Sequence, residues 1–173
     1  MRDLTNEAEE IMRELSETIA SVFADRYSQN AARIRELAGP LSDAEFWQKP
    51  LSFGNSFGHL VLHLTGNLNY YIGAQIGNTS YVRDRPREFT DSSPPPKAET
   101  LKRFDGAVTM VLSTIRAQST EDWRKEYSGA GTDAKTRLEL FMICAAHMQL
   151  HIGQMIYLGY EIAGRQRPNL AKT

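Results

Sequence analysis

The chain has 173 residues, of which 41% are hydrophobic, and 20 basic side chains nearly balance 21 acidic ones. This length is typical of one domain with a full core, and the near-zero net charge argues against a nucleic-acid-binding protein, which needs a basic surface. The single cysteine, Cys144, excludes an intramolecular disulfide and favours a reducing compartment. No stretch approaches the ~20 apolar residues of a membrane span, and the acidic N-terminus has no signal-peptide pattern. We therefore expect a cytoplasmic protein without a membrane or nucleic-acid partner.

Apolar residues recur with helical periodicity in four long segments, which we predict to be helices at residues 5–38, 56–75, 97–117 and 134–160. Gly39-Pro40 ends the first of them. The apolar stripe of this first segment is expected to face the other helices and contains Ile11, Leu15, Ile19, Val22 and Phe23.

The remaining segments are short or irregular. Residues 42–45 form a capping box, which predicts one helical turn carrying Phe46 and Trp47 onto the other helices. Residues 77–96 form a long connection whose triple proline cannot be helical, and 119–133 looks irregular apart from one short turn. No segment has the alternation of a strand.

These elements predict an all-α fold. We expect one four-helix-bundle domain over residues 1–163, with the long connection crossing between the second and third helices, and a polar tail at residues 164–173. Bundles of this kind hold metal ions in the core, on side chains from facing helices.

The four histidines form two pairs with the same spacing, His59 with His63 and His147 with His151. Residues four apart lie on one face of a helix, about 6 Å apart along its axis, so both imidazoles can bind a single ion. On an ideal wheel of the last helix, His147 and His151 fall within roughly 20° of the centre of the apolar stripe. Two buried imidazoles need partners for four ring nitrogens, which favours metal ligands over simple core residues.

The two histidines of the second predicted helix, His59 and His63, differ in their position relative to its apolar stripe. His63 lies on the flank of the apolar stripe, whereas His59 lies almost opposite to it, so we expect His59 at the surface. The predicted metal site is therefore His63, His147 and His151. Three neutral imidazoles suit divalent Zn, Ni, Co or Fe, and they leave a coordination position open, which is typical of catalytic sites.

Three polar residues are candidates for support of the site. Asn67 and Gln154 lie near the histidines on the wheels and are expected to orient the ligand rings. Asp105 falls on the apolar stripe of the third helix, where it would be a base beside the ion or a fourth ligand; the alternative places it in water at the end of the bundle. Cys144 lies one turn before His147 and is interpreted as a small buried hydrophobe, with metal binding as the alternative.

The long connection also contains three arginines, Arg83, Arg85 and Arg87. We interpret them as part of a solvated loop, with the binding of an anionic substrate as the alternative. The sequence has no Gly-rich phosphate loop, nucleophile elbow, dinucleotide fingerprint or HEXXH motif, which argues against the enzyme classes that depend on them.

Two motifs resemble a known family. Residues 56–67, SFGHLVLHLTGN, look like the second-helix signature of the DinB-like (damage-inducible) superfamily, and residues 147–154, HMQLHIGQ, resemble its signature on the last helix. The DAEFW segment before the second helix also matches. The resemblance implies an up-down-down-up four-helix bundle, often a homodimer, with a Zn or Ni ion on His63, His147 and His151.

Family members with known activity are similar to metal-dependent transferases that act on low-molecular-weight thiols such as bacillithiol or mycothiol. The resemblance thus implies a thiol S-transferase that joins such a thiol to a small electrophilic substrate at the open metal site. The alternative is a non-catalytic metal-binding stress-response protein, or a structural dimeric bundle.

Overall fold

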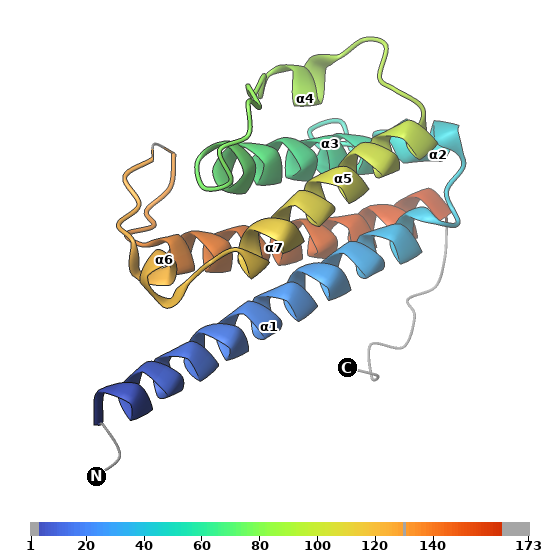
Figure 1. The fold of residues 1–173 in the computed structure, drawn as a ribbon. Coiled ribbons are helices and arrows are strands. Elements are labelled where there is room, and N and C mark those ends of the chain that lie inside the picture. Colours follow the sequence, from blue (N-terminus) through green and yellow to red (C-terminus); the bar gives the residue numbers. More distant parts are fainter. Residues whose placement is uncertain (1–3, 130, 164–173) are drawn as a thin grey trace.

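The computed structural model describes residues 4–129 and 131–163, and its regular structure is helical (Figure 1). Within those ranges no strand forms, and an isolated bridge pairs Glu126 with Thr136. The prediction of an all-α fold is therefore confirmed. The elements in chain order are α1 (Leu4–Ala38), α2 (Asp43–Trp47), α3 (Phe57–Leu68), the π-helix η1 (Asn69–Ala74), α4 (Arg87–Thr90), α5 (Lys97–Arg116), α6 (Thr120–Arg124) and α7 (Arg137–Ala163).

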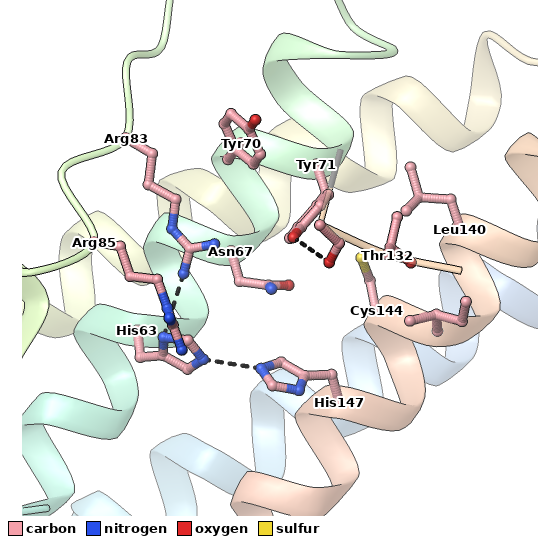
Figure 2. Close-up of a pocket in the computed structure, with 12 residues that line it drawn as sticks. His63, Asn67, Tyr70, Tyr71, Arg83, Arg85, Thr132, Leu140, Cys144 and His147 are labelled. Atoms are coloured by element: carbon pink, nitrogen blue, oxygen red, sulfur yellow. Dashed lines mark hydrogen bonds between the residues drawn. The ribbon is translucent and has the colours of Figure 1, made fainter. Parts of the chain in front are cut away.

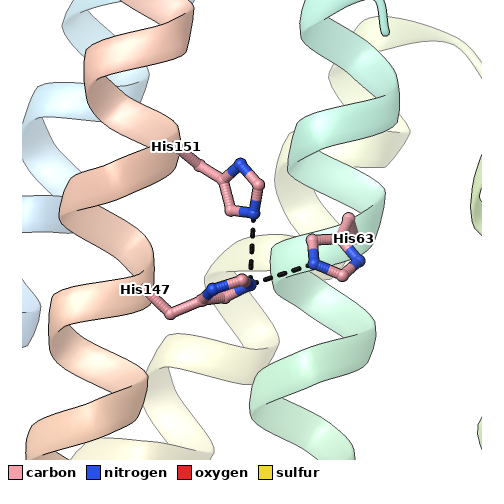
Figure 3. A group of neighbouring side chains, drawn as sticks. All are labelled: His63, His147 and His151. Atoms are coloured by element: carbon pink, nitrogen blue, oxygen red, sulfur yellow. Dashed lines mark hydrogen bonds between the residues drawn. The ribbon is translucent and has the colours of Figure 1, made fainter.

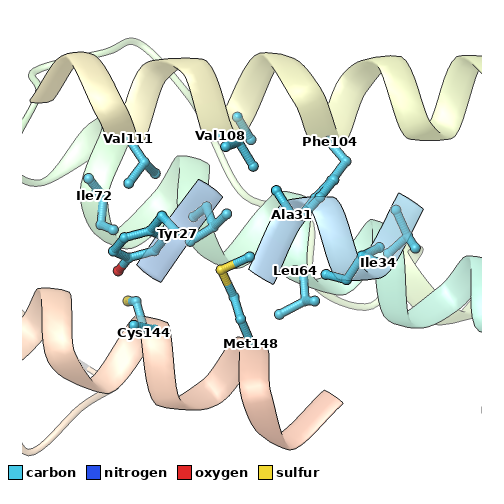
Figure 4. Packing of buried hydrophobic residues seen from close by; sticks show 14 of the residues in the cluster. Tyr27, Ala31, Ile34, Leu64, Ile72, Phe104, Val108, Val111, Cys144 and Met148 are labelled. Carbon is cyan, nitrogen blue, oxygen red and sulfur yellow. The ribbon is translucent and has the colours of Figure 1, made fainter. Parts of the chain in front are cut away.

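Four long helices of the described chain share one hydrophobic core. Helix α1 packs against α5 and α7, and α3 packs against the same two helices. Figure 4 shows side chains from all four meeting, among them Tyr27 and Ala31 of α1, Leu64 of α3, Val108 of α5 and Met148 of α7. None of the described helices has both the length and the hydrophobicity needed to cross a bilayer. The up-down-down-up order of the helices stays a prediction.

Two buried hydrogen bonds fix α7 against α1. The Tyr27 hydroxyl donates to the carbonyl of Phe141 at 2.7 Å, and the Asn30 amide donates to the carbonyl of Ala145 at 3.3 Å. A buried polar group without a partner destabilises the fold, so these contacts favour one rotation of α7 about its axis. That rotation sets the direction in which the histidines of α7 point.

The apolar stripe of α1 is only partly buried. Ile11, Leu15 and Val22 were expected to face the other helices, but their exposed fractions are 58%, 50% and 62%. The buried face of α1 instead contains Tyr27 and Ile34, toward its C-terminal end. The prediction failed because the face of α1 that packs on the other helices, which near Ser16 and Phe23 is covered by Trp123 of α6, lies roughly 140° around the helix from the three exposed residues. Figure 1 shows the N-terminal end of α1 extending away from the bundle.

The second long helix changes its hydrogen-bond pattern before it ends. The prediction was one α-helix to Gln75, but residues 69–74 form the π-helix η1, in which the N–H of Gln75 donates to the carbonyl of Tyr70 at 3.3 Å. π-Turns are rare and occur mostly at functional sites. This one carries Tyr70 and Tyr71, which line the cavity described below.

The connection after η1 covers α3. It contains the short helix α4, which packs on α3 and which the sequence analysis did not predict. Between them, α4, α2 and the long helices bury nearly the whole circumference of α3. The outward face of α3, which the wheel assigns to solvent, is therefore inside the protein.

Candidate metal centre

Three histidines from two helices converge on one point (Figure 3). His63 comes from α3, and His147 and His151 come from successive turns of α7. The Nε2 atom of His147 lies 3.0 Å from that of His63 and 3.1 Å from that of His151. One ligand nitrogen from each ring lies within 4.8 Å of the other two. The structure thus brings together the three residues that the sequence analysis selected.

Partners on the far side of two rings determine which nitrogen faces the centre. Nδ1 of His63 lies 2.9 Å from Oε2 of Glu88, and Nδ1 of His151 lies 2.7 Å from Oε1 of Gln154. The nearest partner of each Nδ1 is an oxygen acceptor, so we assign the proton to Nδ1; Nη2 of Arg83, at 3.3 Å from Nδ1 of His63, is the more distant contact. A neutral imidazole has one N–H, which leaves the Nε2 lone pairs of His63 and His151 directed at the centre.

The centre has too few protons for hydrogen bonds alone. Burial, followed by the neighbouring histidines, lowers the pKa of His147 to about 4, and burial also lowers the pKa of His151, so both are neutral at pH 7. Nε2 of His147 carries at most one proton, which can satisfy one neighbouring lone pair but not both. A divalent cation satisfies all three nitrogens at once.

The spacing of the nitrogens suits such an ion. A tetrahedral Zn site with bonds of about 2.1 Å holds its ligand nitrogens roughly 3.4 Å apart. The contacts of 3.0 and 3.1 Å to His147 are close to this value. Small rotations of the rings would accommodate the ion, with at least one coordination position left over.

A buried carboxylate that the sequence analysis missed supports this centre. Glu88 of α4 is 7% exposed and binds Arg83 through both oxygens, with Nε to Oε1 at 2.7 Å and Nη2 to Oε2 at 3.0 Å. Burial alone would raise the pKa of Glu88, but the hydrogen bonds from His63 and Arg83 outweigh it and lower that pKa. An ionised carboxylate on Nδ1 of a ligand histidine fixes its ring and increases its basicity.

The prediction that Arg83 is part of a solvated loop is therefore wrong. Its side chain is 9% exposed because the connection folds back over α3 and brings Arg83 and Glu88 together. The sequence offered one weak signal for this pair, a glutamate among the arginines of the connection. Periodicity cannot identify such a contact, because it joins residues of a segment with no regular pattern to a helix.

Gly66 makes room for the carboxylate. A Cβ atom at this position would lie 2.1 Å from Oε1 of Glu88 and 2.9 Å from its Cδ. Gly66 follows His63 by three residues on the same side of α3, so the missing side chain lets Glu88 reach the histidine. The glycine of the second-helix motif thus has a local structural role.

The prediction that His59 lies at the surface is wrong. His59 is 7% exposed. Its Nδ1 accepts two hydrogen bonds from Ser56, one from the hydroxyl at 2.6 Å and one from the backbone N–H at 3.3 Å. The indole of Trp47 packs edge-on against its ring, over Gly58, where a Cβ would lie only 2.5 Å from the indole. His59 completes a capping box at the start of α3 and lies outside the three-histidine cluster.

The three supporting candidates have different surroundings. Gln154 holds His151, as described above. Asp105 pairs instead with Arg35 at 2.7 Å, with a side chain 44% exposed, so it is neither a ligand nor a base at the centre. Asn67 is 8% exposed and makes no hydrogen bond to a histidine; its Oδ1 is buried without a partner among the described residues.

On the wheel, the histidines of α7 lie less centrally than predicted. The α7 residues with 0% exposure, Leu140, Phe141, Met148 and Met155, have their mean direction roughly 60° from the histidine pair at 100° per residue. His147 and His151 therefore point past the core toward α3. This is the direction that allows them to meet His63.

A cavity of about 630 Å³ opens beside His63 and His147 (Figure 2). Asn67, Arg85 and Cys144 also line it. Burial raises the pKa of Cys144 to about 12, so its sulfur is a thiol at neutral pH and acts as a small buried side chain. The volume is in the range of sites that bind small molecules.

Comparison with known proteins agrees with this architecture. A crystal structure of a conserved protein from Enterococcus faecalis superposes with a TM-score of 0.69, over 84% of this chain and 97% of that chain, at 16% sequence identity; this likeness shows the fold alone. No curated protein sequence matches the chain. The family model of the DinB superfamily matches residues 26–155, which include all three converging histidines. The chain belongs to the DinB superfamily.

Proposed function

We propose that this protein is a metal-dependent enzyme of the thiol S-transferase type, with a divalent ion, Zn or Ni, on His63, His147 and His151. The observation that carries the proposal is the convergence of three Nε2 atoms with too few protons to satisfy one another. It is supported by membership of a superfamily in which the same histidine pattern is expected to bind a metal.

The cavity supports catalysis rather than a purely structural ion. A structural Zn site has four protein ligands, whereas three ligands leave room for a substrate. The cavity reaches two of the three histidines and has the volume for a small thiol and an electrophile. When bound, the ion would supply the positive charge that lowers the pKa of a thiol at neutral pH.

The residues of the chain would have distinct roles in this reaction. The three histidines hold the ion, and Glu88 and Gln154 keep two of the rings in the orientation that presents Nε2. Leu140 and Ile143 line the cavity with apolar surface, which excludes water from the reacting groups. Cys144 does not act as the nucleophile, because its raised pKa keeps it protonated.

A screen of thiols against electrophiles tests the proposal. Tag-free protein loaded with Zn or Ni is incubated with cellular thiols and a panel of electrophiles, and loss of free thiol is measured. We expect conjugation with the wild type and none with His147→Ala, which should also lose the metal on elemental analysis. Full metal content in His147→Ala would overturn the metal site. Metal binding without any conjugation, together with a large loss of thermal stability on chelation, would favour the non-catalytic alternative.

We further propose that the protein is a homodimer with the up-down-down-up helix order that the resemblance implies. Ile11, Leu15 and Val22 lie within roughly 40° of one another on α1 and form an exposed apolar stripe. Exposed stripes of large apolar side chains are typical of interaction surfaces. A second copy of the chain would cover this stripe.

A further inference from the structure

The charged side chains that line the cavity beside the three histidines are all basic. They are the guanidiniums of Arg83 and Arg85, and no aspartate or glutamate is among the described residues that line the cavity. The guanidinium of Arg83 is already neutralised, because both oxygens of Glu88 bind it at 2.7 and 3.0 Å. The charge that matters to a ligand is therefore that of Arg85.

Arg85 is exposed to solvent, and no ion pair among the described residues includes it. It extends from the connection toward His63 and the cavity, as Figure 2 shows. The neighbouring arginine of the same segment, Arg87, differs: it lies 3.4 Å from Asp91 and does not line this cavity. An unpaired planar guanidinium at the wall of a cavity suits a carboxylate, which it binds through two parallel hydrogen bonds.

A second polar group in the same cavity also lacks a partner. Oδ1 of Asn67 is buried and accepts no hydrogen bond, although the residue is only 8% exposed. Buried acceptors of this kind are uncommon because the loss of water is not compensated. In Figure 2 the amide of Asn67 extends into the space between His63 and Cys144. In this conformation Oδ1 has almost no surface open to the cavity, so a ligand with an N–H or O–H donor would satisfy it after a rotation of the Asn67 amide.

We propose that the thiol substrate carries a carboxylate, bound by Arg85, and a hydrogen-bond donor, bound by Oδ1 of Asn67. This inference rests on the proposed thiol chemistry at the three histidines and deepens it by naming the substrate class. Arg85 and Asn67 are then specificity-determining residues, while His63 and His147 lie at the end of the cavity where the sulfur would be placed. Charge-assisted pairing with a guanidinium predicts a preference of about tenfold or more for the carboxylate-bearing thiol.

Two thiols that differ by one carboxylate provide the test. N-acetylcysteine and N-acetylcysteamine share the thiol and the amide N–H, and only the first has the carboxylate. Each is titrated into cobalt-loaded protein, and binding is followed by the sulfur-to-cobalt charge-transfer absorption. We expect N-acetylcysteine to bind wild type about tenfold more tightly, Arg85→Ala to remove that preference, and Arg87→Ala to retain it. Equal binding of both thiols to wild type, or the same loss in Arg87→Ala as in Arg85→Ala, would overturn the assignment of Arg85.

The role of Asn67 is tested with a thiol that has no donor. Ethanethiol and N-acetylcysteamine are compared in wild type and in Asn67→Leu. We expect the preference for N-acetylcysteamine to be lost in the variant, because the amide then has no acceptor. A preference that survives in Asn67→Leu would contradict this part of the proposal.

A metal-free arm separates this inference from the proposed function. N-acetylglycine and N-acetylglycinamide are titrated into metal-free protein, and the side-chain amide signal of Asn67 is followed by NMR. Tighter binding of the carboxylate, lost in Arg85→Ala, would support the anion site even if no thiol produces a charge-transfer band. If N-acetylcysteine and N-acetylcysteamine give equal charge-transfer bands, and N-acetylglycine and N-acetylglycinamide bind equally, the anion site is contradicted. The proposed thiol chemistry at the three histidines is then unaffected.

Discussion

Oε2 of Glu88 lies 2.9 Å from Nδ1 of His63, and through this contact a residue of the connection orients a ring on α3. Arg83, from the same connection, holds the carboxylate on its other side. The segment that links the second and third long helices thus supports the three-histidine cluster, although it supplies none of the three histidines.

Replacement of Glu88 by Gln keeps the size of the side chain but removes its charge. Because partners of this kind fix the ligand ring, we expect the affinity for Zn to fall by about 10- to 100-fold. Competition with a chromophoric chelator measures the affinity. Asp91→Asn, in the same connection but paired with the exposed Arg87, is the matched control and should bind Zn like wild type. An unchanged affinity in Glu88→Gln would show that His63 needs no support from this carboxylate.

Gly66→Ala displaces the same carboxylate without changing it. The new Cβ would lie 2.1 Å from Oε1 of Glu88, so we expect weaker Zn binding and a loss of about 1–3 kcal/mol of stability. Gly106→Ala is the control, because a Cβ there meets nothing within 4 Å and should stabilise helix α5 by about 0.4–1 kcal/mol. Urea unfolding compares the two variants. Similar effects of both would mean that the close approach at Gly66 does not matter.

His59 should affect stability rather than metal content. Loss of its contacts to Ser56 in His59→Ala removes half of a capping box, which costs about 1 kcal/mol. His59→Gln can restore the contact and should be closer to wild type, since Gln is common at this position of the box. Elemental analysis should find a full equivalent of metal in both variants. Loss of metal from either would place His59 in the metal centre after all.

Asp122 makes stability depend on acid pH. Hydrogen bonds from Lys125 and from Ser119 hold the pKa of Asp122 well below its ordinary value of 3.8. A depressed folded pKa contributes stability that is present above pH 3.8 and is lost as the pH falls through the folded value. We expect Asp122→Asn to lose about 1 kcal/mol at pH 7, where the cap is charged, and less at pH 2. Chemical denaturation at both pH values measures this; an equal loss at both would contradict the prediction.

The proposed dimer should depend on the exposed stripe of α1. Leu15→Lys combined with Val22→Lys would place two charges in the interface, and we expect the sedimentation coefficient to change from that of a dimer to that of a monomer. Phe53→Lys combined with Val82→Lys changes two side chains that are each 88% exposed and lie off this stripe, so it should leave the dimer intact. A monomeric wild type would overturn the proposal.

The sequence by itself determined the helices and the three histidines. Helix periodicity, caps and Gly39-Pro40 are local, so they predicted the all-α fold and most helix ends to within a few residues. The i, i+4 spacing of His147 and His151 is equally local. The choice of His63 over His59 needed only the position of each residue around one helix.

The tertiary structure alone decided what covers each face. His59 was predicted to be exposed because its helix has one apolar stripe, but Trp47 and α4 cover the other side of α3. Glu88 and Arg83 come from a segment without periodicity, and their pairing depends on how that segment folds back. The environment of a side chain is set by long-range packing, which the pattern of one helix cannot encode. The histidines could therefore be identified from the sequence, whereas the residues that contact them could be identified only from the tertiary structure.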